Sequence, residues 1–237
     1  MTLPHILLAL DTATEICSVA IAVDGRVTEL AETVGQRHSE RILPMADEML
    51  QSTGLRLGDC DAIAFGAGPG AFTGLRIACG IAQGLAFAVD KPIVAIGNLA
   101  ALALAASAAA PGARRILAAI DARMQEVYWA MFSVDGGRPV AITAPALAAA
   151  SELVQIGRRY APDLLAGNAW RAFPDIEASL AIVSAPDARA SAREVAMLAV
   201  AAFAAGDAVP AAWAAPIYVR DRVALTIEER QASARAR

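Results

Sequence analysis

A pattern that occurs twice decides the fold: it reads Leu7-Leu8-Ala9-Leu10-Asp11 and, some 110 residues later, Leu117-Ala118-Ala119-Ile120-Asp121. Each copy is a short apolar run that ends in aspartate. Each is followed by a second apolar run and then by an Asp-Gly pair, at Asp24-Gly25 and at Asp135-Gly136. An Asp-Gly pair between two apolar runs is a strong hairpin signal. Although any two hairpins can look alike, two copies of this strand-rich unit predict a duplicated lobe.

The repeat and the chain length of 237 residues together predict two lobes. We expect an N-terminal lobe at residues 1–110 and a C-terminal lobe at residues 111–220. The remaining residues, 221–237, are rich in charge and predict a peripheral tail.

Hydrophobic periodicity and turn residues predict the remaining elements. The expected helices cover residues 39–52, 75–89, 151–159 and 191–205, and the expected strands cover residues 61–65, 92–96 and 164–166. The last helix begins with Ser191-Ala192-Arg193-Glu194, which fits a capping box, and Gly206 is its stop signal. The order strand, helix, strand within residues 61–96 implies a parallel part of a sheet and therefore an α/β fold.

Composition favours a globular protein in a reducing compartment. Hydrophobic residues make up 57% of the chain, but the apolar stretch 99–110 is shorter than the roughly 20 residues that a membrane span requires. No Lys or Arg precedes the first apolar run, so we expect a core strand there and no signal peptide. Cys17, Cys60 and Cys79 lie far apart and predict neither a disulfide framework nor a metal site. We therefore expect a cytoplasmic protein with no membrane partner.

The charge pattern bears on nucleic-acid binding. The formal net charge is −4, and no run of Lys or Arg forms a basic patch. If RNA is involved, we expect another subunit to supply most of the phosphate contacts.

The glycine-rich stretch 66–76 is the first candidate site. It matches the letters of a dinucleotide fingerprint, but Pro69 removes an amide that would face the phosphates, and it does not follow the first strand. Two interpretations remain open: a tight turn that lets a helix pack on a sheet, and a loop of free amides that suits an anion. With the first Asp turn, it supplies the candidate phosphate-binding residues Asp11, Thr12, Gly68, Gly70, Thr73 and Gly74.

Paired Asp turns are typical of actin-like and sugar-kinase-like ATPases, in which two such turns hold phosphates across a cleft. The second turn here, Asp121-Ala122-Arg123-Met124-Gln125, lacks the glycines and hydroxyls that cradle phosphate. We therefore expect no ATP hydrolysis by the chain alone. The two histidines, His5 and His38, have no spacing for a metal pair, and no Gly-x-Ser-x-Gly elbow supports a Ser-His-Asp triad. We expect no catalytic residue and no bound metal.

Four stretches together resemble the TsaB (YeaZ) family, the non-catalytic subunit of the bacterial machinery that makes threonylcarbamoyladenosine (t6A) in tRNA. They are residues 9–14, 38–45, 68–76 and 119–128, with a weaker fifth at 216–220. The resemblance implies duplicated RNase H-like lobes of the actin-like/Hsp70-like ATPase fold. It also distinguishes the chain from TsaD, the catalytic relative with a metal-binding His-x-x-x-His motif, because Asn98 and Leu102 stand where those histidines would be.

The resemblance further implies a heterodimer with TsaD, joined transiently by the ATPase TsaE. The complex transfers threonylcarbamoyl to N6 of adenosine 37 in tRNAs that read codons beginning with A. No cofactor of its own is implied, but ATP or ADP would bind at the junction with TsaD. The predicted interface lies on the helices 39–52 and 73–89, and on the second helix small residues recur every four positions, at Gly80, Gly84 and Ala88. The predicted interface residues are Ser39, Ile42, Met45, Met49, Arg76, Ile77, Gly80 and Gly84. Two alternative functions remain: an autonomous ATPase or sugar kinase, and a metallopeptidase-like protein. When isolated, the chain could also form a homodimer.

Overall fold

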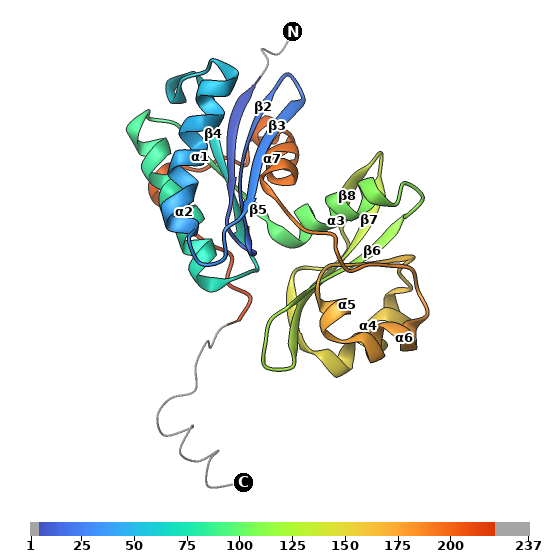
Figure 1. The fold of residues 1–237 in the computed structure, drawn as a ribbon. Helices are drawn as coiled ribbons and strands as arrows, with labels where there is room; N and C mark the ends of the chain where they lie inside the picture. The colour runs from blue at the N-terminus through green and yellow to red at the C-terminus, as the bar shows by residue number, and fades with distance from the viewer. Residues whose placement is uncertain (1–4, 221–237) are drawn as a thin grey trace, which may run out of the picture.

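The computed structural model describes residues 5–220, and the first half of this range forms a five-stranded sheet in the order β3-β2-β1-β4-β5 (Figure 1). Its strands are β1 (Ile6–Asp11), β2 (Ile16–Val23), β3 (Arg26–Thr33), β4 (Ala62–Gly68) and β5 (Ile93–Gly97). Strands β1, β2 and β3 pair antiparallel, whereas β4 and β5 run parallel to β1. The predicted hairpin at Asp24-Gly25 is confirmed: both residues have positive φ, at 52° and 75°, as a two-residue type I′ turn requires.

A second sheet repeats this plan. Its strands are β6 (Arg115–Asp121), β7 (Glu126–Asp135), β8 (Arg138–Ala141), β9 (Ala146–Ala149), β10 (Leu164–Ala166) and β11 (Ser184–Ala185). The order β11-β10-β6-β7-β8 places β6 antiparallel to β7 and parallel to β10, as β1 lies antiparallel to β2 and parallel to β4. The predicted duplication of an α/β lobe is therefore confirmed in the strand topology.

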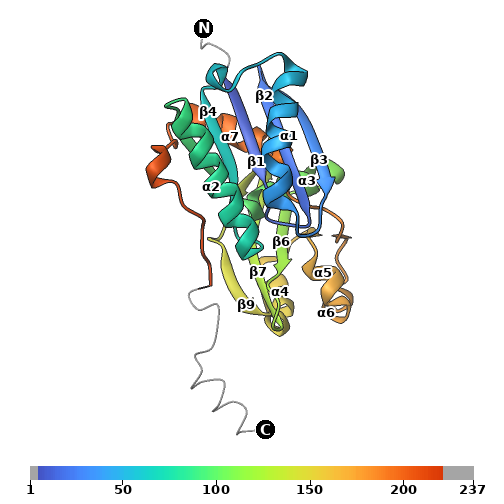
Figure 2. The same ribbon diagram turned by 60° about the vertical axis from the view of Figure 1, so that its left-hand side comes forward.

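Helices form layers around both sheets. The longer ones are α1 (His38–Thr53), α2 (Phe72–Ala88), α3 (Asn98–Ala109), α4 (Leu153–Tyr160) and α7 (Ala192–Ala205), and the shorter ones are α5 (Ala169–Ala172) and α6 (Pro174–Leu180). Short 3-10 turns lie at Leu57–Asp59, Ala150–Glu152 and Ala211–Trp213. Figure 2 shows α1 and α2 over one face of the first sheet and α7 over the other. Helices α4 to α6 cover the outer face of the second sheet.

Strand β1 shows how the sequence builds these layers. Side chains alternate along a strand, so Leu8 and Leu10 join the core under α1 and α2, while Leu7 and Ala9 face α7. The core between the two sheets also contains α3 and is rich in alanine, which lets the helices approach closely. Burial on both faces explains why this strand is apolar throughout.

Helix α7 packs on the first sheet, although its residues fall within the range 111–220 that we assigned to the second lobe. Its first-turn amides explain this placement. The amide of Ala192 donates to the buried Ser18 Oγ at 2.9 Å, and the amide of Arg193 donates to Glu29 Oε1 at 2.9 Å. The capping box of Ser191 and Glu194 is present as predicted. The chain that follows α7 also pairs with the first sheet, through Val209 and Ile93. The boundary at residue 110 itself stays a prediction, and the predicted tail 221–237 lies outside the described residues.

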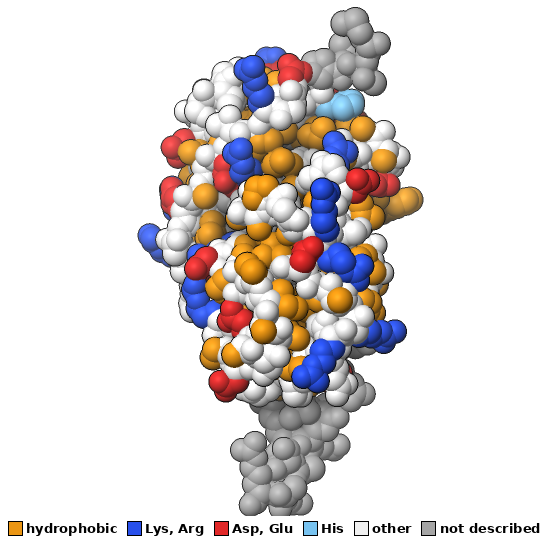
Figure 3. All heavy atoms as spheres, turned by 90° about the vertical axis from the view of Figure 1, so that its right-hand side faces the viewer, with side chains coloured by type: hydrophobic (Ala, Val, Ile, Leu, Met, Phe, Trp, Pro, Cys, Tyr) orange, Lys and Arg blue, Asp and Glu red, His pale blue; other side chains and the backbone are white. Residues whose placement is uncertain are grey.

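The elements differ from the predicted ones in several places, and two of these lie near the cleft. Helix α3 occupies the apolar stretch that we considered only as a membrane span, and strand β4 continues through Gly68, which we placed in a turn. Among residues 5–220, none of the helices is long and apolar enough to cross a membrane. On the face seen in Figure 3, basic and acidic side chains are interspersed around a central hydrophobic area.

Candidate functional site in the cleft between the lobes

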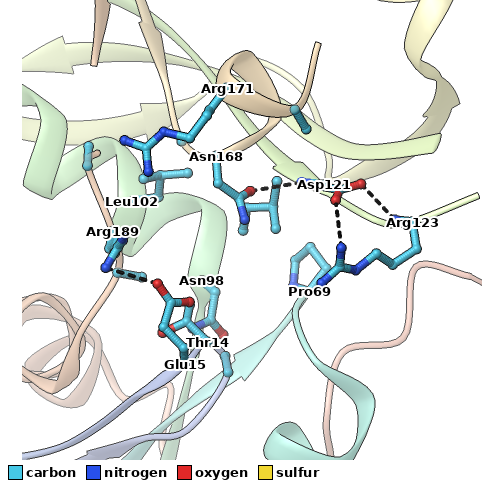
Figure 4. Close-up of a pocket in the computed structure, with 16 residues that line it drawn as sticks. Thr14, Glu15, Pro69, Asn98, Leu102, Asp121, Arg123, Asn168, Arg171 and Arg189 are labelled. Carbon is cyan, nitrogen blue, oxygen red and sulfur yellow. Dashed lines mark hydrogen bonds and ion pairs between the residues drawn. The ribbon is translucent and has the colours of Figure 1, made fainter. Parts of the chain in front are cut away.

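Two cavities lie between the lobes. One has a volume of about 290 Å³ and is lined by the β1–β2 turn, the start of α3 and residues 167–172 and 188–190 (Figure 4). The other has a volume of about 860 Å³ and is lined by the glycine loop, the start of α1 and residues 217–220. Both have the Asp turn at Asp121 on the opposite wall. The two predicted turns therefore do face one another across a cleft.

Asp11 does not point into this cleft. Its side chain is completely buried, and its Oδ2 accepts a 2.5 Å hydrogen bond from Asn98 Nδ2. Its Oδ1 accepts one from the amide of Ala13 at 3.0 Å. Asn98 Oδ1 in turn accepts the amide of Gly68 at 2.6 Å, which ties β1, β4 and α3 together. Burial raises the pKa of the Asp11 carboxyl to about 7, although both hydrogen bonds lower it.

The prediction that Asp11 and Thr12 hold phosphate is therefore wrong for these side chains. Thr12 is also completely buried, and its hydroxyl donates to the carbonyl of Gly74 at 2.7 Å. Both side chains have their hydrogen-bonding groups occupied within the protein, so neither is available to a ligand. Asn98 serves as the buried hydrogen-bond partner of Asp11.

The glycines of the stretch 66–76 support the first of the two interpretations, a tight turn that lets a helix pack on a sheet. A Cβ at Gly74 would lie 1.9 Å from the carbonyl oxygen of Thr12, and one at Gly70 would lie 2.9 Å from Ala13 Cβ. Gly68 has a φ of 119°, which side chains rarely adopt. These glycines let α2 approach the first Asp turn closely. The amide of Thr73 remains free at the start of α2, and its side chain is exposed.

Ion pairs surround the smaller cavity. Arg189 contacts Glu15 at 2.9 Å, and Arg171 pairs with Asp187. Asp121 is held by Asn168 and Arg123: Asn168 Oδ1 accepts the amide of Asp121 at 2.9 Å, and Asp121 Oδ1 accepts the amide of Arg123 at 2.8 Å (Figure 4). The carboxylates that line this cavity are thus already paired. The sequence alone could not identify the pair of Glu15 and Arg189, because it joins segments far apart in the chain.

The second Asp turn has an unusual backbone. Arg123, Met124 and Gln125 all have positive φ, at 63°, 57° and 61°. Such angles are uncommon for residues other than glycine and concentrate at functional sites. The turn also places Met124 at the surface, where it is 71% exposed. The sequence motif 119–128 drew attention to this turn without revealing its geometry.

The predicted interface residues divide into two groups. Ile42, Met45 and Met49 have no exposed area, because the apolar stripe of α1 packs on the first sheet. The prediction that these three residues meet a partner is therefore wrong. The other predicted residues remain accessible: Ser39, Arg76, Gly80 and Gly84 are exposed, and Ile77 is half-buried.

Several accessible apolar residues on or near α1 and α2 were missed. Leu43 of α1 is 44% exposed, Phe87 of α2 is 83% exposed and Trp213 is 76% exposed. Single exposed side chains give no periodic signal, so only burial in the folded chain identifies them. A Cβ added at Gly80 or at Gly84 would have no atom within 4 Å, so the surface above these two residues is open.

We expect Met45→Ala to cost about 2–5 kcal/mol of unfolding free energy, because it removes a buried side chain and leaves a cavity. Leu43→Ala, a neighbouring change on the exposed face, should cost less than about 1 kcal/mol. Urea denaturation followed by circular dichroism measures both values. Equal costs for the two variants would contradict the assignment of the buried face of α1.

The described residues contain no group of three or more His, Cys, Asp or Glu side chains that could hold a metal ion. Cys17, Cys60 and Cys79 are buried free thiols, and burial raises the pKa of each.

Known proteins match this fold and these loops. A family described as "TsaD: tRNA N6-adenosine threonylcarbamoyltransferase" matches residues 15–225. The tRNA threonylcarbamoyladenosine biosynthesis protein TsaB of Escherichia coli K12 is 38% identical over 226 residues, which cover 92% of this chain and 96% of that protein. The solved structure of YeaZ from Pseudomonas aeruginosa superimposes with a TM-score of 0.79 at 38% identity, covering 90% of this chain and 99% of that one.

A more distant structure shows the wider fold. Component A of (R)-2-hydroxyglutaryl-CoA dehydratase from Acidaminococcus fermentans has a TM-score of 0.51 at 12% identity, over 84% of this chain and 99% of that one. This likeness supports the duplicated lobes of the actin-like ATPase fold and carries no function with it. The identity and coverage of the E. coli and P. aeruginosa relatives are decisive, and the chain belongs to the TsaB (YeaZ) family, whose role is in t6A biosynthesis.

Proposed function

We propose that the chain is a scaffold subunit that binds TsaD and supports threonylcarbamoyl transfer to N6 of adenosine 37 in tRNAs that read ANN codons. The observation that carries this proposal is the open face of α2. Gly80 and Gly84 are exposed one turn apart with free space above them, and Phe87 lies 83% exposed near the end of the helix. Small residues at this spacing allow a partner helix to approach the backbone closely, and an adjacent exposed aromatic ring can anchor it.

The neighbouring surface extends this face. Helix α1 contacts α2 and exposes Leu43. At the start of α2, the guanidinium of Arg76 lies 3.8 Å from the ring centre of Phe72, and Arg76 Nε donates to the Tyr218 hydroxyl at 3.0 Å. An apolar centre with an arginine at one end is typical of protein interfaces.

The cleft supports a role without catalysis by this chain. Asp11 is bonded to Asn98, Glu15 is paired with Arg189, and Asp121 accepts the amide of Arg123, so these three carboxylates are already occupied within the protein. We assign no catalytic residue and propose that TsaD supplies the chemistry, that TsaE joins transiently, and that tRNA binds to the complex. ATP or ADP would bind at the junction with TsaD. Such a complex would work in the cytoplasm, and the isolated chain would pair with a second copy through the same open face.

The test is to place charge on the open face. We expect Gly84→Glu to abolish co-purification with TsaD and tRNA modification, because an acidic side chain would be buried against the partner without a counter-charge. Gly84→Ala is the matched control: it adds only a methyl group at an open helical position, so the fold should gain about 0.5–1 kcal/mol. Circular dichroism of both variants verifies folding. Normal binding and modification by a folded Gly84→Glu variant would show that the face is not the interface.

An autonomous ATPase or sugar kinase is the second candidate, favoured only by the two cavities between the lobes. Under that alternative the purified chain would hydrolyse ATP, and Asp11→Ala would abolish turnover. A metallopeptidase would cleave peptides until a chelator is added. The absence of a metal-binding group among residues 5–220 gives that alternative no support.

A further inference from the structure

The segment 214–220 joins the two lobes, and we call it the strap. It follows the 3-10 turn Ala211–Trp213, and Figure 2 shows it as the red-orange chain that descends beside α2. It includes residues 216–220, the weakest of the five stretches that carry the family resemblance. Its first part is bonded to α2 and β4, and its last residue is bonded to the second Asp turn. The strap therefore connects a helix of the first lobe with a turn of the second.

The first lobe holds the strap closely. The side chain of Gln83 on α2 donates from Nε2 to the carbonyl of Ala214 at 3.1 Å. Three residues further on, the amide of Ile217 donates to the carbonyl of Ala67 in β4 at 2.7 Å. A Cβ at Gly68 would lie only 2.8 Å from the carbonyl oxygen of Ile217, so the strap lies directly on β4. These contacts fix the path of the strap and hence the position of its last residue.

Arg220, the last residue of the strap, holds the second Asp turn. Its Nη2 donates to the carbonyl of Ala122 at 3.0 Å and to Glu126 Oε2 at 2.5 Å. These two residues lie on either side of residues 123–125, all three of which have positive φ. The Arg220 side chain is only 14% exposed, so its ion pair is better shielded from water than a surface pair. One guanidinium thus fastens both ends of the left-handed stretch.

The turn requires such support because its backbone is strained. Residues other than glycine rarely adopt positive φ, and such strain persists only where surrounding contacts fix it. Within the turn, the amide of Ala122 donates to the carbonyl of Glu126 at 2.9 Å, and the amide of Glu126 donates to the carbonyl of Arg123 at 3.0 Å. Arg220 adds a bond from outside at each end. Without those two bonds, the turn is free to relax.

We propose that the strap is a conformational device that couples α2 to the second Asp turn. While the strap lies on α2 and β4, Arg220 is in place and the turn keeps its strained form. When the strap is loosened on α2, Arg220 withdraws and the turn relaxes at the wall of the cleft. The coupling runs through a continuous set of bonds, from Gln83 through the strap to Glu126.

The strap also contacts the surface to which we assign a partner. Arg76, at the start of α2, donates from Nε to the Tyr218 hydroxyl at 3.0 Å. The device therefore links the accessible face of α2 with a turn that lines both cavities of the cleft. It is a property of this chain alone, so it can be tested without TsaD and stands whether or not TsaD binds that face.

The first test removes the end of the strap that holds the turn. Arg220→Ala should speed hydrogen exchange of the Ala122 and Glu126 amides about tenfold, because their bonds open when the turn relaxes. NMR of the ¹⁵N-labelled full-length chain measures these rates. The amides of β4 should keep their rates. Arg138→Ala, which removes an exposed guanidinium on β8 of the same lobe, is the matched control and should change neither amide.

The second test loosens the strap at its other end. Gln83→Leu removes the donor to the start of the strap, and it should speed exchange in the turn about fivefold. Gln155→Leu, the same substitution at an exposed position of α4, is its control. In the double variant, Gln83→Leu should add nothing to the effect of Arg220→Ala, since both changes act through the same contact.

Three results would overturn the proposal. Unchanged exchange at Ala122 and Glu126 in folded Arg220→Ala would show that the turn holds itself. No effect of Gln83→Leu on the turn, or effects of the two substitutions that simply multiply, would show that the strap transmits nothing. Faster exchange throughout the chain in either variant, together with a lower Tm, would indicate a general loss of stability in place of coupling.

Discussion

Gly74→Ala should destabilise the folded chain by about 3 kcal/mol or more and lower Tm by roughly 10 °C. A Cβ at this position would lie 1.9 Å from the carbonyl oxygen and 2.9 Å from the carbonyl carbon of Thr12. The obstacle is backbone, so no side-chain rotation can relieve the contact. Moving α2 away would also break the bond from the Thr12 hydroxyl to the carbonyl of Gly74.

Gly80→Ala is the control for this prediction, because it is the same substitution in the same helix at a position with no atom within 4 Å. It should stabilise the chain by about 0.5–1 kcal/mol, since alanine loses less backbone entropy than glycine in a helix. Thermal and urea denaturation of the two variants provide the comparison. Similar stabilities would mean that α2 does not lie against the first Asp turn as described.

Asn98→Leu should cost about 3–5 kcal/mol at pH 8, the second large effect we expect. It leaves the buried Asp11 carboxylate without its 2.5 Å donor and the amide of Gly68 without an acceptor. Ser107→Ala in the same helix removes only a hydroxyl that bonds the carbonyl of Leu104, and it should cost about 1 kcal/mol or less. Urea denaturation at several pH values measures both.

The pH dependence of the unfolding free energy tests whether Asp11 causes the loss of stability in Asn98→Leu. Its pKa in the folded chain is raised to about 7 from 3.8, so the folded state binds the proton more tightly than the unfolded state does. The stability that this proton contributes is complete below pH 4 and is lost as the pH rises from about 4 to 7. Removing the Asn98 donor raises the pKa of Asp11 further, so the variant should continue to lose stability above pH 7, where the parent chain no longer does.

The double variant Asp11→Leu/Asn98→Leu completes this cycle. It removes the charge together with its partner, so it should be more stable at pH 8 than Asn98→Leu alone and lose the Asp11 contribution to the pH dependence. A double variant that is less stable than the single one, with the same slope above pH 7, would show that Asp11 is not the titrating group.

Local chemistry allowed much of the fold to be predicted. The hairpin at Asp24-Gly25 and the capping box at Ser191 are present as predicted, and the second predicted hairpin is present with its turn one residue later, at Gly136-Gly137. The hairpin turns and the capping box depend on interactions among residues a few positions apart, which a single sequence displays directly. The repeat likewise predicted two lobes, because the same pattern of strands forms the same pairing each time it occurs.

The sequence was sufficient to locate the candidate site, but not to assign a role to each residue in it. The motifs at 9–14, 68–76 and 119–128 do meet at one cleft, as the paired Asp turns suggested. The direction of Asp11 depends on Asn98, which lies 87 residues away, and a motif does not include so distant a partner. The nitrogens of His38 and Arg220 that lack a partner among residues 5–220 likewise emerge only when three distant segments form one cavity.

By itself the sequence determined the repeated strand pattern, the Asp24-Gly25 hairpin, the start of α7 and the family, because these follow from periodicity, turn chemistry and motifs. Only the tertiary structure decided that Ile42, Met45 and Met49 are core residues while Gly80 and Gly84 are open. It also decided that α7 returns to the first sheet, where Ser18 and Glu29 accept its first amides. The physical reason is that burial and hydrogen-bond partners across the chain depend on which surfaces meet, whereas helix and turn signals depend only on neighbours in sequence.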